Sequence, residues 1–400
     1  PRSGFVLMEI LLLAVVITGF LVEAMRIDLA QAQETAFVGQ LTAELLKPWF
    51  IGQSGYIGFW WLHGVLALSF IAYIPFSPLA HMLFIPVNAV LADPNIGADE
   101  KAIDLGAMDE AEVEEEQTDE LPALGTPTLG DYQPKPLFDF STCLWCGRCQ
   151  EVCPATQTKK SLSPKGVLLT LAEMLESGKM DDAGMIDNVG METLFECRTC
   201  GACVEVCPAM TNPLKAMWNM RQNLMMERGE MPAHMLPAYR NMEALMHPFE
   251  SSASPSDWRE GLEVPEFKPG ETEYLLWIGC AVTYEDRAQK IGRAVVKILN
   301  QVGLSYGIIE DARCTGDPAK QMGDDYLFSM MAGANIDLFN DHGVQKIITT
   351  CPHCFNSFTK YYPPLGAEYE VIPHARLLNE LIEDGKVDLG KNSEKIAYHD

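Results

Sequence analysis

The sequence predicts a multidomain protein, in which transmembrane α-helices precede a helical domain with two cysteine runs and then an α/β domain. Three observations support this order: apolar stretches before residue 92, a cysteine spacing that occurs twice, and alternating strand and helix patterns after residue 273. The 400 residues are 48% hydrophobic and 21% charged, which is apolar enough for large cores or a membrane part. This composition excludes wholesale disorder.

The charge balance separates function classes. The chain has 55 acidic and 29 basic residues and a formal net charge of -26, so as a whole it repels a phosphate backbone. Nucleic-acid binding is therefore disfavoured. Twelve cysteines are too few for a small disulfide-stapled secreted domain, and eight of them fall in two tight runs that indicate metal ligation in a reducing compartment.

The predicted domain boundaries follow changes in composition. We expect a membrane part at 1–92, an acidic linker at 93–136, a helical domain at 137–246, a linker at 247–272 and an α/β domain at 273–400. The chain begins with Pro1 and stops at Asp400 directly after an apolar segment. We therefore expect it to be a fragment of a longer protein.

Two apolar stretches predict membrane spans. Eighteen residues from Phe5 to Val22 contain a single charge, Glu9, which is long enough for one span. From Pro48 to Ala92 there is no Asp, Glu, Lys or Arg, and we expect a second span to begin near Tyr56. A helix continued to Ala92 is about 55 Å long, beyond a bilayer core of about 30 Å. It is therefore expected to leave the bilayer near the prolines Pro75, Pro78 and Pro86.

Two histidines on the second stretch are candidate metal ligands. His63 and His81 are eighteen residues apart, which is five turns of a continuous helix, so both imidazoles would share one face about 27 Å apart along the axis. This spacing suits one axial ligand for each of two stacked haems. The alternative is a pair of interfacial histidines that hydrogen-bond to neighbouring helices.

The run LHGVLALSFIAYIPFSPLAHMLFIPV, from Leu62 to Val87, resembles the last helix of the cytochrome b (gamma) subunit of respiratory nitrate reductase. The resemblance implies that His63 and His81 each ligate one haem b. In that family each haem takes its other ligand from an earlier helix, so the two histidines are half-sites in this chain.

The acidic linker predicts a solvated tether. Twelve acidic residues and one lysine lie between Asp93 and Glu120, and a stretch rich in Pro, Gly and Thr follows. Docking of a basic partner is the alternative. The few basic residues do not orient the spans, but the cysteine runs require a reducing side, so the C-terminal part is expected in the cytoplasm.

The two cysteine runs predict two cubane clusters. Each has the spacing C-x2-C-x2-C-x3-C-P, the bacterial ferredoxin pattern for two [4Fe–4S] clusters, in which the fourth cysteine of each run serves the other cluster. A zinc site is the alternative. The predicted ligands are Cys143, Cys146, Cys149 and Cys207 for the first cluster, and Cys197, Cys200, Cys203 and Cys153 for the second.

Helical segments are expected around the second run. The residues between the runs, including Leu168 to Leu175, predict a helical insertion. After Pro213 methionines recur at helical spacing, which is typical of adaptable core packing, with contact to a quinone or a partner as the alternative.

The C-terminal part predicts a parallel α/β unit, because strands alternate with helices. Its four cysteines follow the expected strands, and the carboxyl ends of parallel strands are where such sheets place their sites, so the thiols should converge. Free buried cysteines are the alternative. The expected strands are Tyr274 to Ile278, Tyr306 to Ile309 and Lys346 to Thr350, the expected helices are Arg287 to Val302 and Asp325 to Asn340, and the cysteines are Cys280, Cys314, Cys351 and Cys354.

Residues from Leu137 to Asp400 resemble the iron–sulfur oxidoreductases of the heterodisulfide-reductase-D type. The runs Cys314-Thr-Gly-Asp-Pro318 and Thr350-Cys-Pro-His-Cys-Phe-Asn356 look like the first cysteine-rich "CCG" domain of that family, which carries two ferredoxin runs upstream. The resemblance implies a further [4Fe–4S] cluster of non-cubane type. Thr315 stands where a paired form has a second cysteine, which leaves open whether this domain holds that cluster, an ordinary one, or only part of a site completed by a second copy.

A chain in which a cytochrome b part precedes such an iron–sulfur oxidoreductase resembles a membrane-bound family. Members of that family exchange electrons between an electron-transfer flavoprotein and menaquinone. We therefore expect a quinone-linked oxidoreductase in the cell inner (plasma) membrane, a chain of one-electron carriers. The alternatives are a quinol-linked thiol–disulfide reductase and an electron-wire subunit of a larger dehydrogenase. No phosphate loop or Gly-x-Gly-x-x-Gly motif occurs, which argues against nucleotide chemistry.

Overall fold

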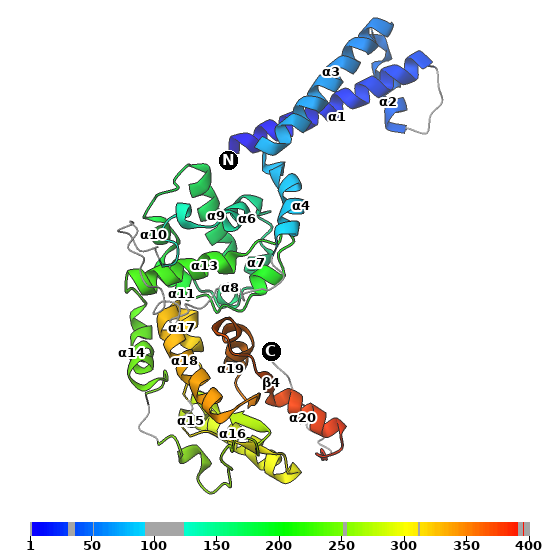
Figure 1. Cartoon of the computed structure of the whole chain (residues 1–400). Helices are drawn as coiled ribbons and strands as arrows, with labels where there is room; N and C mark the ends of the chain where they lie inside the picture. The colour runs from blue at the N-terminus through cyan, green and yellow to red at the C-terminus, as the bar shows by residue number, and fades with distance from the viewer. Residues whose placement is uncertain are drawn as a thin grey trace. The chain divides into compact units, whose positions relative to one another are not determined.

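The computed structural model describes residues 2–30, 37–50, 52–92, 124–250, 254–310, 313–390 and 395 (Figure 1). It divides into two compact units. One comprises Pro1–Ala92, Phe138–Leu144 and Pro208–Thr211, and the other comprises Asp93–Leu137, Trp145–Cys207 and Asn212–Asp400. Most of the expected acidic tether, 93–123, and the closing residues 396–400 lie outside the described residues.

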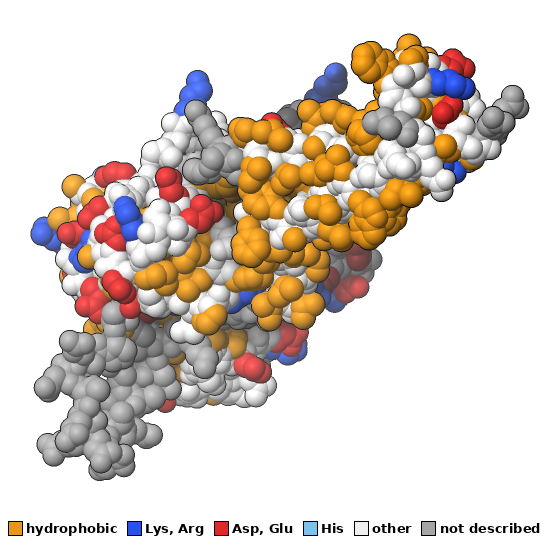
Figure 2. Space-filling model, turned by 90° about the horizontal axis from the view of Figure 1, so that it is seen from above, with side chains coloured by type: hydrophobic (Ala, Val, Ile, Leu, Met, Phe, Trp, Pro, Cys, Tyr) orange, Lys and Arg blue, Asp and Glu red, His pale blue; other side chains and the backbone are white. Residues whose placement is uncertain are grey.

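The first unit is built on apolar helices. Helices α1 (Arg2–Ala30) and α3 (Gly52–Tyr73) pack against each other, and α2 (Phe37–Leu46) packs on α1. Two segments, Phe5–Ala30 and Gly52–Phe76, are long and apolar enough to cross a membrane. Figure 2 shows hydrophobic side chains spread over the surface of these helices. This agrees with the two predicted spans, by length and composition.

The second apolar stretch is not one continuous helix. After α3, the 3-10 turns Ile74–Phe76 and Pro78–Ala80 are separated by Ser77, whose backbone is extended at φ -116° and ψ 168°. Helix α4 (His81–Leu91) begins only after this break. Proline lacks a backbone N–H and disfavours helix at the residue before it, which explains a break at Ser77-Pro78. The expected five-turn register between the two histidines is therefore wrong, because they lie on separate helices.

The helical part of the second unit surrounds the cysteine runs. The expected insertion is confirmed as α9, α10 and α11, and the helix expected after Pro213 is α13, where Met217 and Met220 are buried core residues. The elements are α6 (Pro134–Thr142, whose last residues belong to the first unit), α7 (Arg148–Glu151), α8 (Pro154–Gln157), α9 (Pro164–Glu176), α10 (Met185–Val189), α11 (Met191–Phe195), α12 (Ala202–Glu205), α13 (Pro213–Gln222) and α14 (Leu236–Leu245).

The C-terminal part holds a four-stranded parallel sheet with the order β2-β1-β3-β4. The three expected strands are confirmed, and a fourth follows them. The elements are β1 (Tyr274–Trp277), α15 (Gly279–Tyr284), α16 (Asp286–Val302), β2 (Tyr306–Gly307), α17 (Asp317–Met322), α18 (Asp325–His342), β3 (Lys346–Thr349), α19 (Pro352–Asn356), β4 (Glu370–Pro373) and α20 (His374–Glu383). The direction of strand order reverses between β1 and β3, so their carboxyl ends form a topological switch point.

Helices cover both faces of this sheet. Leu276 of β1 packs with apolar residues of α16 and α20, whereas the next residue, Trp277, contacts Phe339 of α18 and Phe358. Successive side chains of a strand point to opposite faces, so β1 is buried on both sides. Trp277 is only 1% exposed. The sheet is thus held rigidly at the edge where the cysteines follow.

Candidate iron–sulfur and thiol sites

The two cysteine loops repeat in backbone conformation as well as in sequence. Trp145 and Thr199 have positive φ values of 57° and 51°, and the glycines Gly147 and Gly201 follow at 83° and 75°. Each glycine lies directly before a short helix, α7 or α12. Positive φ in Trp and Thr costs energy that the surrounding fold must supply, and such residues cluster at ligand-binding loops. In the second loop the Thr199 N–H donates to Cys197 Sγ at 3.4 Å.

Four cysteines from both runs line one small cavity. Its walls are completed by apolar side chains such as Leu162, Leu214 and Met217. Three thiols come from the second run and one from the first, as the crossed ferredoxin ligation requires. The four residues are Cys153, Cys197, Cys200 and Cys203.

Electrostatics at this cavity oppose free thiolates. Burial raises the pKa of Cys197, and the nearby Arg221 guanidinium opposes that rise. Burial also raises the pKa of Cys203 strongly, and the neighbouring cysteines add to it. Buried thiolates without a cation are therefore unfavourable here, so a positively charged iron cluster suits this set of donors.

The other expected ligand set divides between the two units. Cys143 falls in the unit with the N-terminal helices, whereas Cys146, Cys149 and Cys207 fall in the second unit. Cys146 is exposed and the other three are half-buried. The grouping of these four around the first cluster stays a prediction.

The four remaining thiols gather at the carboxyl edge of the sheet, as expected. Cys280 lies in α15 after β1, Cys314 precedes α17, and Cys351 and Cys354 lie at the start of α19 after β3. The Cys280 and Cys314 thiols are hydrogen-bonded to each other, as are those of Cys351 and Cys354, and Cys314 interacts electrostatically with Cys354.

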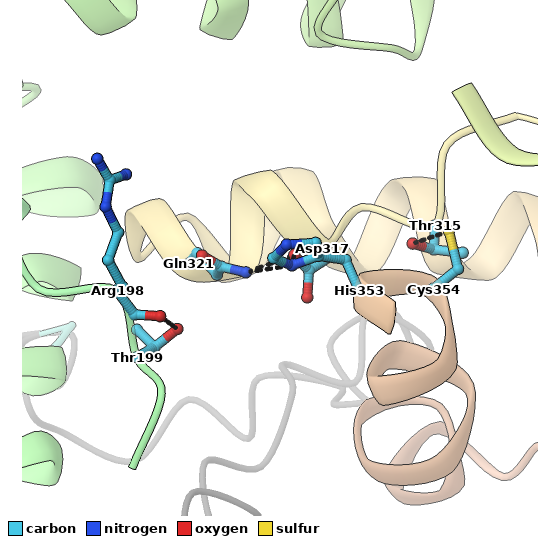
Figure 3. Close-up of polar contacts among 7 residues, drawn as sticks. All are labelled: Arg198, Thr199, Thr315, Asp317, Gln321, His353 and Cys354. Atoms are coloured by element: carbon cyan, nitrogen blue, oxygen red, sulfur yellow. Dashed lines mark hydrogen bonds and ion pairs between the residues drawn. The ribbon is translucent and has the colours of Figure 1, made fainter. Parts of the chain in front are cut away.

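The Cys351–Cys354 pair is electrostatically asymmetric. The Cys354 thiol and the backbone N–H groups of His353 and Cys354 donate to Cys351 and lower its pKa to about 6. The same contact, together with burial, raises the pKa of Cys354, while the indole N–H of Trp277 opposes that rise. The Thr315 hydroxyl also donates to Cys354 Sγ at 3.7 Å (Figure 3). Thr315, in the place of a second cysteine, thus faces the thiols as a hydrogen-bond donor.

A polar chain that the sequence did not reveal lies beside these thiols. His353 Nδ1 is 2.9 Å from Asp317 Oδ2, and the Gln321 side-chain amide donates to the same carboxylate oxygen at 2.5 Å (Figure 3). Asp317 raises the pKa of His353 by this hydrogen bond. The contact fixes the His353 ring at the start of α19, between the two cysteines. The two quoted motifs contain His353 and Asp317, but neither predicted that they would contact each other.

Arg221 was likewise missed by sequence reasoning. It is 3% exposed on α13, and its guanidinium donates to three backbone carbonyls. Leu194 O, at the end of α11, and Cys197 O, in the second cysteine loop, accept at 2.6 and 2.5 Å. The third carbonyl, Gln321 O, lies in α17 at 2.6 Å. One side chain therefore joins the second cysteine loop to the cysteine-rich α/β part.

Among the residues that the structure describes, no group of three or more His, Cys, Asp or Glu side chains is arranged to hold one metal ion. The choice between iron–sulfur clusters and zinc at the cysteine runs stays a prediction from their spacing.

A larger cavity of about 460 Å³ adjoins the thiols at the ends of β1 and β2. Cys280 and Cys314 form part of its wall, together with Arg313 and the stacked rings of His247 and Tyr284, whose centroids are 4.0 Å apart. This volume is in the range of small-molecule sites. The cavity gives a small reactant room beside two of the thiols.

The expected haem histidines have different surroundings. His63 Nδ1 on α3 is 2.9 Å from Thr18 Oγ1 on α1, and Thr18 donates its own proton to Ala14 O at 2.7 Å. The Thr18 hydroxyl has one proton, so when it donates to Ala14 O it accepts from His63 Nδ1–H, and Nε2 is then the unprotonated nitrogen. That tautomer suits a metal ligand. His81 begins α4 and shares no face of a continuous helix with His63.

Comparison with known proteins gives two domain matches. A family profile described as "4Fe-4S dicluster domain" matches residues 135–208, and one described as "Cysteine-rich domain" (CCG) matches residues 274–359. Both contain cysteines described above. No solved structure matched this chain.

Similar proteins have related names. The chain is 31% identical to EtfAB:quinone oxidoreductase of Syntrophomonas wolfei, over 98% of this chain and 60% of that protein. It is 30% identical to a protein of Chromohalobacter salexigens named "Probable membrane-anchored ferredoxin", over 69% and 46%. It is 24% identical to the D component of the dihydromethanophenazine:CoB–CoM heterodisulfide reductase of Methanosarcina mazei, over 70% and 71%.

The chain spans about 60% and 46% of the first two of these proteins. The similarity to the first extends over the apolar helices, since it covers 98% of this chain. Fold, cysteine sites and relatives agree with the resemblance inferred from sequence: this chain matches the iron–sulfur oxidoreductases of the heterodisulfide-reductase-D type.

Proposed function

We propose that this chain is part of a membrane-anchored oxidoreductase that passes electrons between a soluble electron-transfer flavoprotein and menaquinone. One observation carries the proposal. Within one unit, Arg221 contacts both the loop of the second cubane site, through Cys197 O, and the part that holds the sheet-edge thiols, through Gln321 O. Two helices long and apolar enough to span a membrane precede these sites, and a relative is named EtfAB:quinone oxidoreductase.

In this proposal the first two sites hold [4Fe–4S] clusters, which carry single electrons when bound. The chain's own residues bind and shield them. Cys153, Cys197, Cys200 and Cys203 supply the thiolates of the second site, and its apolar walls exclude water. The Thr199 N–H favours negative charge on Cys197. The first site is proposed for Cys143, Cys146, Cys149 and Cys207.

The thiols at the sheet edge are proposed to hold a further cluster, either a cubane or the non-cubane type. Trp277 Nε1 has no conventional hydrogen-bond partner among the described residues, yet it is directed at Cys354. A buried N–H in this position suits a negatively charged cluster sulfur as acceptor. Thr315 adds a hydroxyl donor at the same thiol.

Haem b is proposed only as a half-site on this chain. His63 presents an unprotonated Nε2, held by Thr18, and His81 is the second candidate. The second axial ligand of each haem would come from outside the described residues. The proposed orientation places the cysteine sites on the cytoplasmic face of the cell inner (plasma) membrane.

The test uses the native full-length protein in detergent. Reduced electron-transfer flavoprotein is added with a menaquinone analogue, and quinone reduction is followed together with the reduced-minus-oxidised optical spectrum. Quinone reduction with at least two cubane signals in electron paramagnetic resonance (EPR) supports the proposal. Purified protein with iron and sulfide but no quinone reduction from any flavoprotein would contradict it. If haem bands are absent while quinone reduction is seen, only the proposed haem role of His63 and His81 is contradicted.

A second candidate function is a quinol-linked disulfide reductase. The cavity of about 460 Å³ beside Cys280 and Cys314 favours it, because a small disulfide has room there. One relative is a component of a heterodisulfide reductase. Consumption of two electrons per substrate disulfide, with release of two thiols, would support this function in place of flavoprotein oxidation.

A further inference from the structure

Asn88 is a buried polar residue on a helix that otherwise exposes apolar side chains. It lies on α4 and is 0% exposed, whereas Val87 and Val90 of the same helix are 50% and 84% exposed. Burial of a carboxamide is costly unless it is hydrogen-bonded. The partners of Asn88 therefore indicate what this helix is docked on.

The Asn88 amide donates to two separate chain segments. Nδ2 is 2.9 Å from Asp139 Oδ1, 2.8 Å from Ala209 O and 3.2 Å from Met210 O. All of these residues belong to the same compact unit as α4. The rings of Phe84 and Phe138, with centroids 5.4 Å apart, add an apolar contact beside the amide.

Both segments carry a cysteine of the first cubane site. Asp139 is one helical turn before Cys143, which directly follows α6, and Ala209 is two residues after Cys207. These are the first cysteine of the first run and the last cysteine of the second, the two that crossed ligation assigns to one cluster. Asn88 thus contacts a residue near each of these two cysteines.

The second cubane site has a different anchor. Arg221 fastens the Cys197 loop to Gln321 in the cysteine-rich part, and both lie in the other unit. The two buried side chains therefore contact different parts of the chain. Asn88 contacts residues close in sequence to Cys143 and Cys207, whereas Arg221 contacts the carbonyls of Cys197 and Gln321.

We infer that Asn88 is a positioning residue that holds two segments against helix α4: residues 138–144, which include Cys143, and residues 208–211, which follow Cys207 directly. This deepens the proposed function and rests on it, since Cys143 and Cys207 are proposed ligands of the first cubane site.

The experiment compares Asn88→Leu with Arg221→Met in full-length protein in detergent. Leucine has the size of asparagine and no donor, so Asp139 and two carbonyls lose a buried partner. Control variants are Cys146→Ser and Cys200→Ser, which identify the EPR signal of each cluster, and Val90→Ala, an exposed site on the same helix. Iron and sulfide contents are measured for every variant.

The expected result is a separation of effects. In Asn88→Leu, hydrogen–deuterium exchange of residues 138–144 and 208–211 rises about tenfold or more, and the potential of the first cluster shifts while the second is unchanged. In Arg221→Met the second cluster shifts and the first does not. Val90→Ala changes neither.

Two results would overturn the inference. One is unchanged exchange and an unchanged first cluster in Asn88→Leu, and the other is a shift confined to the second cluster. If Asn88→Leu does not fold, Asn88→Ser and Asp139→Asn, which remove fewer contacts, are read by the same exchange measurement. Exchange does not depend on any donor or quinone, so failure of the proposed function is seen separately.

Discussion

Lys320 Nζ lies 2.7 Å from Asp325 Oδ1, and the two side chains are 0% and 2% exposed. The ammonium also faces the rings of Trp218, Phe328 and Tyr361 at 5.6 to 5.9 Å. Trp218 belongs to the helical cysteine part, whereas the others belong to the α/β part. A buried charge pair is costly to bring out of water, but it is more costly to break by removing one partner.

Replacement of Lys320 by methionine is expected to destabilise the protein by about 3–5 kcal/mol, because Asp325 is left as a buried charge without a cation. The free energy of unfolding is measured by urea with tryptophan fluorescence. Lys346→Met is the matched control. Its ion pair with Glu273 is exposed to solvent, so its loss is expected to change stability far less than the loss of the buried pair. Equal losses at the two sites would contradict the buried pair's role.

The Lys320→Met deficit is expected to shrink as pH falls. Burial raises the pKa of Asp325, and Lys320 opposes that rise, so removal of the lysine raises this pKa further. A carboxyl with a raised folded-state pKa favours the folded state below that pKa and loses this stability as pH rises through it. Unfolding of variant and wild type is therefore compared from about pH 8 to about pH 5. A deficit that grows toward acid would refute this account.

Two glycines that end helices of the α/β part are expected to respond differently to alanine. Gly323 follows α17 at φ 93°, and a Cβ there would lie 2.8 Å from the backbone of Arg221 and Gln222. Gly343 follows α18 at φ 65° with open space around it. Gly343→Ala is expected to cost about 1 kcal/mol from left-handed strain alone. Gly323→Ala should cost more, because it also pushes α13 away, and thermal unfolding measures both.

Loss of one thiol at each site is expected to affect different clusters. Cys200→Ala removes a ligand of the proposed second cubane site and should lower iron by about four atoms per chain. Cys314→Ala acts at the sheet edge and should leave both cubane EPR signals intact. Chemical iron and sulfide assays with EPR check both variants. Loss of the cubane signals in Cys314→Ala would show that the sites are not independent.

The Thr18–His63 contact predicts a selective effect on haem in the proposed holoprotein. Thr18→Val removes the acceptor for Nδ1–H and is expected to lower haem retention about tenfold or more, as loss of such supporting contacts does. Thr18→Ser keeps the hydroxyl and serves as the control. The optical haem bands per protein are measured in both. Equal haem in the two variants would make His63 a structural residue.

Much of the fold and of the cysteine sites was predictable from local patterns. Cysteine spacing and the apolar strands are contiguous signals, so the duplicated loops and β1, β2 and β3 were expected at nearly their observed bounds. Strand β4 (Glu370–Pro373) was not, because it is a partly exposed edge strand without a hydrophobic run.

Contacts between distant residues were not predictable from one sequence. Asn88 and Arg221 look like ordinary polar residues until the fold buries them, since nothing nearby in the chain indicates partners 24 to 122 residues away. The break at Ser77 was missed for another reason. Apolar composition continues through the prolines, so hydrophobicity alone could not separate α3 from α4.

The crossed cavity has a consequence for biosynthesis. Cys153 lines the same cavity as Cys197, Cys200 and Cys203, with α9, α10 and α11 between them in the chain. A ribosome that has released only the first run cannot offer a complete set of thiolates to an assembly scaffold. In the proposed holoprotein, insertion of a cluster at this site would therefore wait until Cys203 has left the exit tunnel, and it would then close the intervening helices into a loop tied at both ends.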